Sequence, residues 1–170
     1  SANVASQMLT CQAIRCQKTV VNPTVSNHQD SVRRCTTEET KVKLAIVMIG
    51  TNNATRREDP PEETAAGVHA ILTTLRTRLP QTKILLLAMF PRGQSANDQL
   101  RRVNQAVNER LRAFADQRHV FFLDLGPRFL DKAGRLSEEV MPDALHPNER
   151  GYRLWAEGME DLVKKLLDES

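Results

Sequence analysis

A carboxylate and an imidazole stand three positions apart near the end of the 170-residue chain, at Asp143 and His146. In a tight loop the carboxylate can accept the Nδ1–H of the ring, which leaves the other ring nitrogen free to take up a proton. Pro147 then fixes φ, and Asn148 is suited to cap a following helix. This arrangement predicts half of a nucleophilic triad on a braced loop, although Asp-x-x-His spacings also arise by chance in many sequences.

A side-chain amide follows an apolar run at Asn52, shortly after Gly50, which allows the backbone to turn sharply. Such an amide can donate to negative charge that develops on a carbonyl oxygen, and removing one donor of this kind typically costs about 100- to 1000-fold in rate. Asparagine is equally common as an ordinary loop residue after a strand. The spacing alone leaves both interpretations open.

Three apolar runs, at 44–49, 84–88 and 120–123, predict the strands that must position these residues, each buried in a parallel sheet. Helices are expected from Pro60, from Ser95 with Asp98 as a capping box, and after Asn148, with a short helix near Ser137. The buried stripe of the first helix is expected at Val68, Ile71, Leu72, Leu75 and Leu79.

Alternating strands and helices with short loops predict right-handed crossovers and a sheet covered by helices on both faces. Such a sheet binds ligands outside the carboxyl ends of its strands. Asn52 and Asp124 lie at strand exits, and the loop of Asp143 can reach the same edge after the last crossover. We therefore expect the polar residues to meet at one edge of the sheet.

Composition restricts the other functions. The net charge is +3 with acids and bases interspersed, which does not give the basic stripe of a nucleic-acid binder. No apolar run is long enough for a membrane span, and no signal peptide is visible, which favours a cytoplasmic location. An odd number of cysteines argues against a disulfide framework. Four residues near the start could bind a metal: Cys11, Cys16, His28 and Cys35. Their spacing matches no recognisable zinc site.

Three motifs in one order resemble those of the SGNH (GDSL-type) hydrolase family, including platelet-activating-factor acetylhydrolase catalytic subunits and bacterial GDSL esterases. They are Val-Met-Ile-Gly-Thr-Asn-Asn at 47–53, Pro-Arg-Gly at 91–93, and Asp-Ala-Leu-His-Pro-Asn at 143–148 with Gly151-Tyr152. Three co-linear motifs are far more specific than one. The resemblance implies an α/β fold with three α/β/α layers and a flavodoxin-like parallel sheet. It also implies hydrolysis of acyl esters, such as acetyl esters of lipids or carbohydrates, without metal or organic cofactor.

By this resemblance His146 is the general base, Asp143 the carboxylate that orients it, and Asn52 an oxyanion donor. Asp124 matches no functional motif and is expected to be structural. The family's Gly-Asp-Ser nucleophile block is not recognisable in residues 1–40, which contain no glycine. Ser31 is the nearest candidate nucleophile, although loop serines are common.

Three functional hypotheses follow. The chain is a serine esterase, a catalytically idle or truncated SGNH-fold protein without its nucleophile, or a scaffold that carries an N-terminal Cys/His metal-binding segment. An atypical, weakly ordered segment is expected at 1–40 and an SGNH-hydrolase-like α/β domain at 41–170, with the first strands missing or altered. The expected partner is a small-molecule ester, without nucleic acid or membrane span, and an exposed sheet edge would favour a homo-oligomer.

Overall fold

The computed structural model describes residues 42–53 and 59–168, and within them three short strands form one parallel sheet. The strands are β1 (Leu44–Val47), β2 (Lys83–Leu87) and β3 (Val120–Leu123), in the order β1-β2-β3. Ala45 pairs with Ile84, and Leu86 pairs with Phe122. The predicted parallel sheet is confirmed. The expected segment at 1–40, with Ser31 and the Cys/His residues, lies outside the described residues.

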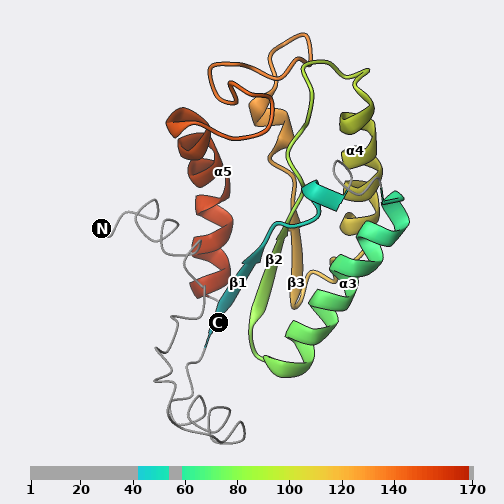
Figure 1. Cartoon of the computed structure of the whole chain (residues 1–170). Coiled ribbons are helices and arrows are strands. Elements are labelled where there is room, and N and C mark those ends of the chain that lie inside the picture. The colour runs from blue at the N-terminus through green and yellow to red at the C-terminus, as the bar shows by residue number, and fades with distance from the viewer. Residues whose placement is uncertain (1–41, 54–58, 169–170) are drawn as a thin grey trace, which may run out of the picture. The chain divides into compact units, whose positions relative to one another are not determined.

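Within the described residues, three helices of 14 residues or more and one short 3-10 helix accompany the sheet. They are α3 (Pro61–Arg78), α4 (Gln99–Arg112), the 3-10 helix η2 (Gly126–Phe129) and α5 (Glu149–Asp168). Helices α3 and α4 pack against each other on one face of the sheet, and α5 lies on the opposite face (Figure 1). The described residues therefore form the three α/β/α layers that the alternating pattern predicts. No helix among them is long and apolar enough to cross a membrane.

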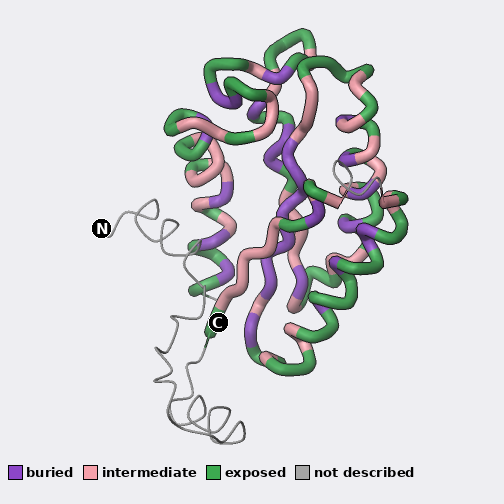
Figure 2. Tube along the Cα trace, in the orientation of Figure 1, coloured by how far each residue is buried: buried purple, intermediate pink, exposed green. Residues whose placement is uncertain are grey.

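The core follows the two-residue alternation of the strands. One face of the sheet packs against the inner sides of α3 and α4 through Ala45, Val47, Ile84, Leu86, Val120 and Phe122. Leu85 and Leu87, which alternate with these residues in β2, are also almost fully buried and point to the face that α5 covers. Buried positions gather in β2 and on the helix sides turned toward it, whereas the outer sides of the helices are exposed (Figure 2).

Two expectations about burial are wrong. β1 ends at Val47 rather than at residue 49, and Ile49 is 46% exposed. The residues of β1 are half-buried because, within the described part of the chain, this strand pairs only with β2 and forms an edge. In α3, Ile71 is 38% exposed, because the buried stripe runs through Val68 and Leu72 and leaves Ile71 on its flank.

Two of the expected helices also differ from the sequence prediction. Asp98, not Ser95, is the N-cap of α4, and its Oδ1 accepts the N–H of Leu100 at 2.9 Å. A carboxylate at this position also interacts favourably with the positive end of the helix dipole. The short helix near Ser137 is a single turn, in which Ser137 O accepts the N–H of Met141 at 3.0 Å. It stops there because Pro142 has no N–H to continue it.

Candidate active site

The loop after the 137–141 turn brings Asp143 and His146 into direct contact. Asp143 Oδ2 lies 2.6 Å from His146 Nδ1, and Asp143 Oδ1 accepts the backbone N–H groups of Leu145 and His146 at 3.0 and 2.7 Å. Ala144 has φ +55°, a left-handed conformation that the carboxylate-bonded turn holds in place. The side chain of aspartate thus builds the loop and orients the ring at the same time.

Hydrogen bonds keep the carboxylate of Asp143 ionised. The backbone N–H of His146, then its side chain, and the N–H of Leu145 lower the pKa of Asp143 from 3.8 to about 2. The carboxylate is therefore ionised at neutral pH and accepts the Nδ1–H of the ring, which leaves the Nε2 lone pair free. The ring is exposed, so Nε2 is accessible to a reacting hydroxyl. This is the geometry of a general base held by a carboxylate.

Contacts on both sides brace the loop. Asn148 Oδ1 accepts the N–H of Gly151 at 3.0 Å, so the predicted cap of α5 is confirmed. The Asn148 N–H donates to Val140 O at 3.0 Å, and its Nδ2 donates to Glu139 O at 2.9 Å. One turn further into α5, the Trp155 ring packs edge-on against Phe90, with centroids 5.0 Å apart. These contacts fix the start of α5 against the chain that leaves β2.

The two adjacent asparagines after β1 have different surroundings. Asn53 Nδ2 donates to Asp59 Oδ2 at 2.9 Å, and the Asn53 N–H donates to Gly50 O at 3.0 Å. Asn52 is exposed and makes no side-chain hydrogen bond within the part of the chain that the structure describes. Asn53 is therefore committed to the loop, whereas the amide of Asn52 is available to an outside group. Gly50 reaches this turn with φ +119°, and a Cβ added to it would lie 3.0 Å from both Met89 Sδ and Thr64 Cγ2.

The Pro-Arg-Gly motif leaves β2 beside the carboxylate of the pair. Burial lowers the pKa of Arg92, and the charges of Asp143 and Asp98 raise it. Arg92 Nη1 is buried, and no group in the described residues accepts a hydrogen bond from it. A guanidinium thus adds positive charge near Asp143. No role for Arg92 was expected from the sequence, and only its place in a motif could have indicated one.

The chain contains a second Asp-x-x-His, at Asp116 and His119, which was not singled out from the sequence. Asp116 Oδ1 accepts the N–H groups of Arg118, His119 and Val120, and Gln117 has φ +57°, so the turn is like that of the first pair. Its Oδ2 lies 3.8 Å from His119 Nδ1, too far for a hydrogen bond. This turn precedes β3, at the amino end of the sheet, where parallel sheets do not bind ligands.

The predicted site residues are only partly brought together. Asp143 and His146 are in contact, but no hydrogen bond joins Asn52 to either of them in the described residues. Asp124 Oδ1 accepts the N–H of Gly126, the first residue of the 3-10 helix, at 2.8 Å, and the structural role expected for Asp124 stays a prediction. The described serines, Ser95 and Ser137, do not hydrogen-bond to His146. Ser31 lies outside the described residues and stays a prediction.

Among the residues that the structure describes, no group of three His, Cys, Asp or Glu side chains is arranged to hold a metal.

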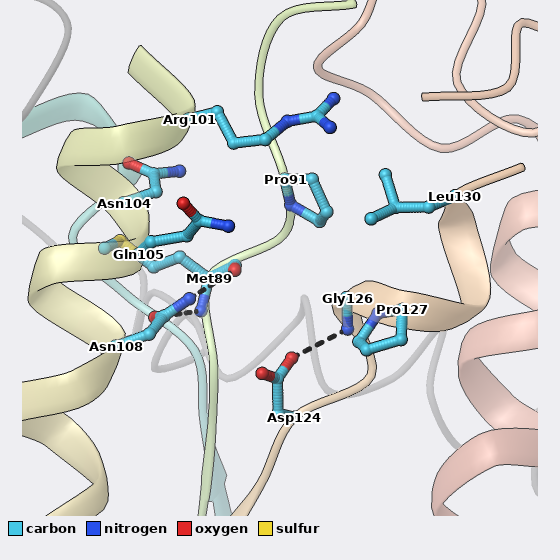
Figure 3. Close-up of a pocket in the computed structure, with 10 residues that line it drawn as sticks. All are labelled: Met89, Pro91, Arg101, Asn104, Gln105, Asn108, Asp124, Gly126, Pro127 and Leu130. Atoms are coloured by element: carbon cyan, nitrogen blue, oxygen red, sulfur yellow. Dashed lines mark hydrogen bonds between the residues drawn. The ribbon is translucent and has the colours of Figure 1, made fainter. Parts of the chain in front are cut away.

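A pocket of about 110 Å³ lies between α4, the chain leaving β2 and the 3-10 helix (Figure 3). Polar groups of Arg101, Asn104, Gln105, Asn108 and Asp124 line it. Neither His146 nor Asn52 belongs to its walls. The pocket therefore forms a neighbouring feature of the same sheet edge rather than the surroundings of the imidazole.

Comparisons with known proteins agree with this architecture. The chain is 36% identical over 134 residues to human platelet-activating factor acetylhydrolase IB subunit alpha2, which covers 78% of this chain and 57% of that protein. It is 34% identical over 131 residues to the human alpha1 subunit, covering 76% and 55%. The chain thus spans little more than half the length of these relatives.

Solved structures show the same fold at lower identity. A carbohydrate esterase family 3 protein from Talaromyces cellulolyticus superposes with TM-score 0.60 and 20% identity, over 77% of this chain and 61% of that one. The M. smegmatis aryl esterase superposes with TM-score 0.57 and 20% identity, over 81% and 67%. The family model described as GDSL-like Lipase/Acylhydrolase matches residues 11–154. The chain therefore belongs to the GDSL-like lipase/acylhydrolase family.

Proposed function

We propose that this chain is an ester hydrolase in which His146 is the general base and Asp143 orients it. The observation that carries the proposal is the 2.6 Å contact between Asp143 Oδ2 and His146 Nδ1 on an exposed loop. An ionised carboxylate on Nδ1 fixes the ring tautomer and stabilises the imidazolium that forms when Nε2 takes a proton. Family membership and the acetylhydrolase relatives support acyl esters as the substrate class.

The proposed reaction has two acyl-transfer steps. Nε2 of His146 removes the proton of a serine hydroxyl while the serine oxygen bonds to the carbonyl carbon of the ester. The carbonyl oxygen then becomes negatively charged. The amide of Asn52, which makes no side-chain hydrogen bond to the described residues, donates to this oxyanion. The alcohol leaves with the proton from His146, and water then releases the acid by the same route. These side chains alone supply the acid–base chemistry, so the proposal needs no metal or organic cofactor.

Ser31 is the proposed nucleophile, and the proposed substrate is a small acetyl or other acyl ester. The alternative is an idle or truncated member of the family, because residues 1–40 carry no glycine with which to build the expected nucleophile turn. Boundaries near residue 41 and assembly into a homo-oligomer also stay proposals. The N-terminal Cys/His metal site is not favoured, since the family match already accounts for the fold.

A fluorophosphonate probe, which reacts covalently with activated serines, tests the function on the full chain. Labelling is expected for the unchanged protein and for His119→Ala, and loss of labelling for His146→Ala. The control is well matched, because both histidines follow an aspartate by three positions in the same kind of turn. A folded protein that is never labelled would overturn the esterase proposal in favour of the idle scaffold. Repeating the assay with Ser31→Ala identifies the nucleophile.

A further inference from the structure

One side of α4 carries polar residues that hold the chain leaving β2. Asn108 Oδ1 accepts the N–H of Met89 at 2.8 Å, and its Nδ2 donates to Met89 O at 2.9 Å. Asn104 Nδ2 donates to Phe90 O at 3.1 Å. The side chains project from the helix toward this segment in Figure 3. Beyond Ala88, whose N–H still donates to Leu123 O, α4 therefore replaces a neighbouring strand as the hydrogen-bonding partner.

Arg101 lies on the same side of α4 as Asn104 and Asn108, and it binds both the chain leaving β2 and a second segment at Gly134. Its Nε donates to Arg92 O at 3.1 Å, Nη2 to Gly93 O at 2.5 Å, and Nη1 to Gly134 O at 2.6 Å. The residue is 1% exposed, and these three acceptors are all backbone carbonyls. Burial lowers the pKa of Arg101, and the charge of Asp98 raises it.

A buried cation of this kind is costly, and an apolar side chain of similar volume is often as stabilising. An apolar side chain, however, cannot bind three carbonyl oxygens from two separate segments. The planar guanidinium with its fixed donor directions does this, and the flexible ammonium of lysine does not. The arrangement therefore favours a role in geometry over a role in filling the core.

Backbone hydrogen bonds connect the two segments to the proposed catalytic loop. Gln94 O, next to Gly93, accepts the N–H of Leu136 at 3.1 Å. Ser137 O then accepts the N–H of Met141, and Met141 O accepts the N–H of Ala144, each at 3.0 Å. Ala144 lies between Asp143 and His146. Three backbone hydrogen bonds, linked to one another and to the guanidinium of Arg101 through adjacent residues of the chain, thus lead to the aspartate–histidine loop.

We propose that Arg101 is a positioning residue that fixes the loop of Asp143 and His146 relative to the Pro-Arg-Gly segment. It touches no reacting atom and acts through Arg92, Gly93 and Gly134. Its importance for catalysis rests on the proposed function. Its effect on the loop does not, and this effect is measured separately.

Backbone amide hydrogen exchange on the full chain tests the proposal with Arg101→Met, Arg101→Lys and the control Arg102→Met. Arg102 is the adjacent residue of α4 and is exposed. In Arg101→Met we expect exchange at Met141 and Ala144 to rise about tenfold or more, while exchange at Leu86 in β2 changes less than about twofold. Arg101→Lys, which keeps the charge but not the planar fork, is expected to show the same local rise, and Arg102→Met none.

Two results would overturn the positioning role: unchanged exchange in the loop, or an equal rise at Leu86, which would make Arg101 an ordinary core residue. If Arg101→Met does not fold, the same comparison in Arg101→Lys decides. NMR of the His146 Nδ1 proton gives a second readout, because its hydrogen-bonded signal should be lost in Arg101→Met and kept in Arg102→Met. If the exchange result holds but the unchanged protein is not labelled by fluorophosphonate, the esterase proposal fails and the positioning role stands.

Discussion

At the scale of single residues, the two Asp-x-x-His turns show what a motif can and cannot specify. Both aspartates accept backbone N–H groups and both turns hold a non-glycine residue at positive φ. Only the pair at Asp143 adds a 2.6 Å contact between the ring and the carboxylate, and only this pair follows the last crossover of the sheet. The spacing therefore specifies the turn, whereas the place in the fold decides whether a ligand can reach the ring.

The ionisation of Asp143 gives a prediction about pH. Its pKa is lowered from 3.8 to about 2 by hydrogen bonds that only the folded loop provides. Because the folded value is the lower one, the stabilisation is complete above about pH 4 and is lost as the pH falls toward 2. The carboxyl carbon signal of Asp143 in NMR should therefore titrate near pH 2. A midpoint near 3.8 would show that the loop bonds are absent in solution.

The neighbouring asparagines give a second prediction. Asn53→Ala removes the hydrogen bond to Asp59 and should lower the free energy of unfolding by about 1 kcal/mol. Asn52→Ala removes no side-chain bond to the described residues and should stay within about 0.5 kcal/mol of the unchanged protein in urea unfolding. If the esterase proposal holds, Asn52→Ala should also lower the rate of labelling by the fluorophosphonate by about 100-fold or more. Equal effects of both changes on stability would contradict this division of roles.

At the scale of elements, Gly151 at the start of α5 packs tightly against the residues that flank the loop of Asp143 and His146. A Cβ on Gly151 would lie 2.4 Å from Val140 O and 2.9 Å from Pro147 Cβ. Val140 O is the acceptor for the Asn148 N–H, so the clash falls on the bond that braces the loop. The helix can start here only because this position has no side chain.

Gly151→Ala should therefore lower the free energy of unfolding by about 1–3 kcal/mol, as overpacking does, and speed amide exchange at Ala144. Gly67→Ala is the matched control. Gly67 is an exposed glycine in α3, and a Cβ added there would meet nothing within 4 Å, so alanine should stabilise by about 0.5–1 kcal/mol. Denaturant unfolding of both variants measures the contrast. An unchanged free energy of unfolding in Gly151→Ala would show that the loop can move to accommodate the added methyl group.

The strands and helices were predictable because hydrophobic periodicity is local. The runs at 84–88 and 120–123 became β2 and β3 to within one residue. The burial of β1 and Ile71 was not predictable in the same way, since it depends on which neighbours cover them. The contact of Asp143 with His146 could be predicted from their spacing. The buried contacts of the polar residues of α4 could not, because polar residues outside the apolar stripe of a helix are normally expected to face solvent.

At the scale of the whole molecule, the described fold begins at residue 42, whereas Ser31, the candidate nucleophile, comes before it in the sequence. Residues 1–41 lie outside the part of the chain that the structure describes. The family model nevertheless begins at residue 11, and the chain spans just over half of its human relatives. The motifs that identified the family all lie after residue 46, which is why the fold could be inferred without the nucleophile.

A chain that begins at Val42 separates the two parts. We expect it to keep slow amide exchange in β2, because Leu85 and Leu86 are fully buried by elements that it retains. If the nucleophile lies in the removed segment, fluorophosphonate labelling should be lost at the same time. Retained labelling would move the search to the hydroxyl groups after residue 41, and loss of exchange protection in β2 would show that the domain boundary is wrong.

The row of polar side chains on α4 also constrains how this helix can change in evolution. Asn108, Asn104 and Arg101 bind Met89, Phe90 and Arg92 in turn along the chain that leaves β2, so helix and chain must stay in register. One inserted residue between Arg101 and Asn108 would rotate one end of the row by about 100° relative to the other and break contacts there. Although much of α4 faces solvent, we expect its length to tolerate insertion and deletion as poorly as that of the central strand.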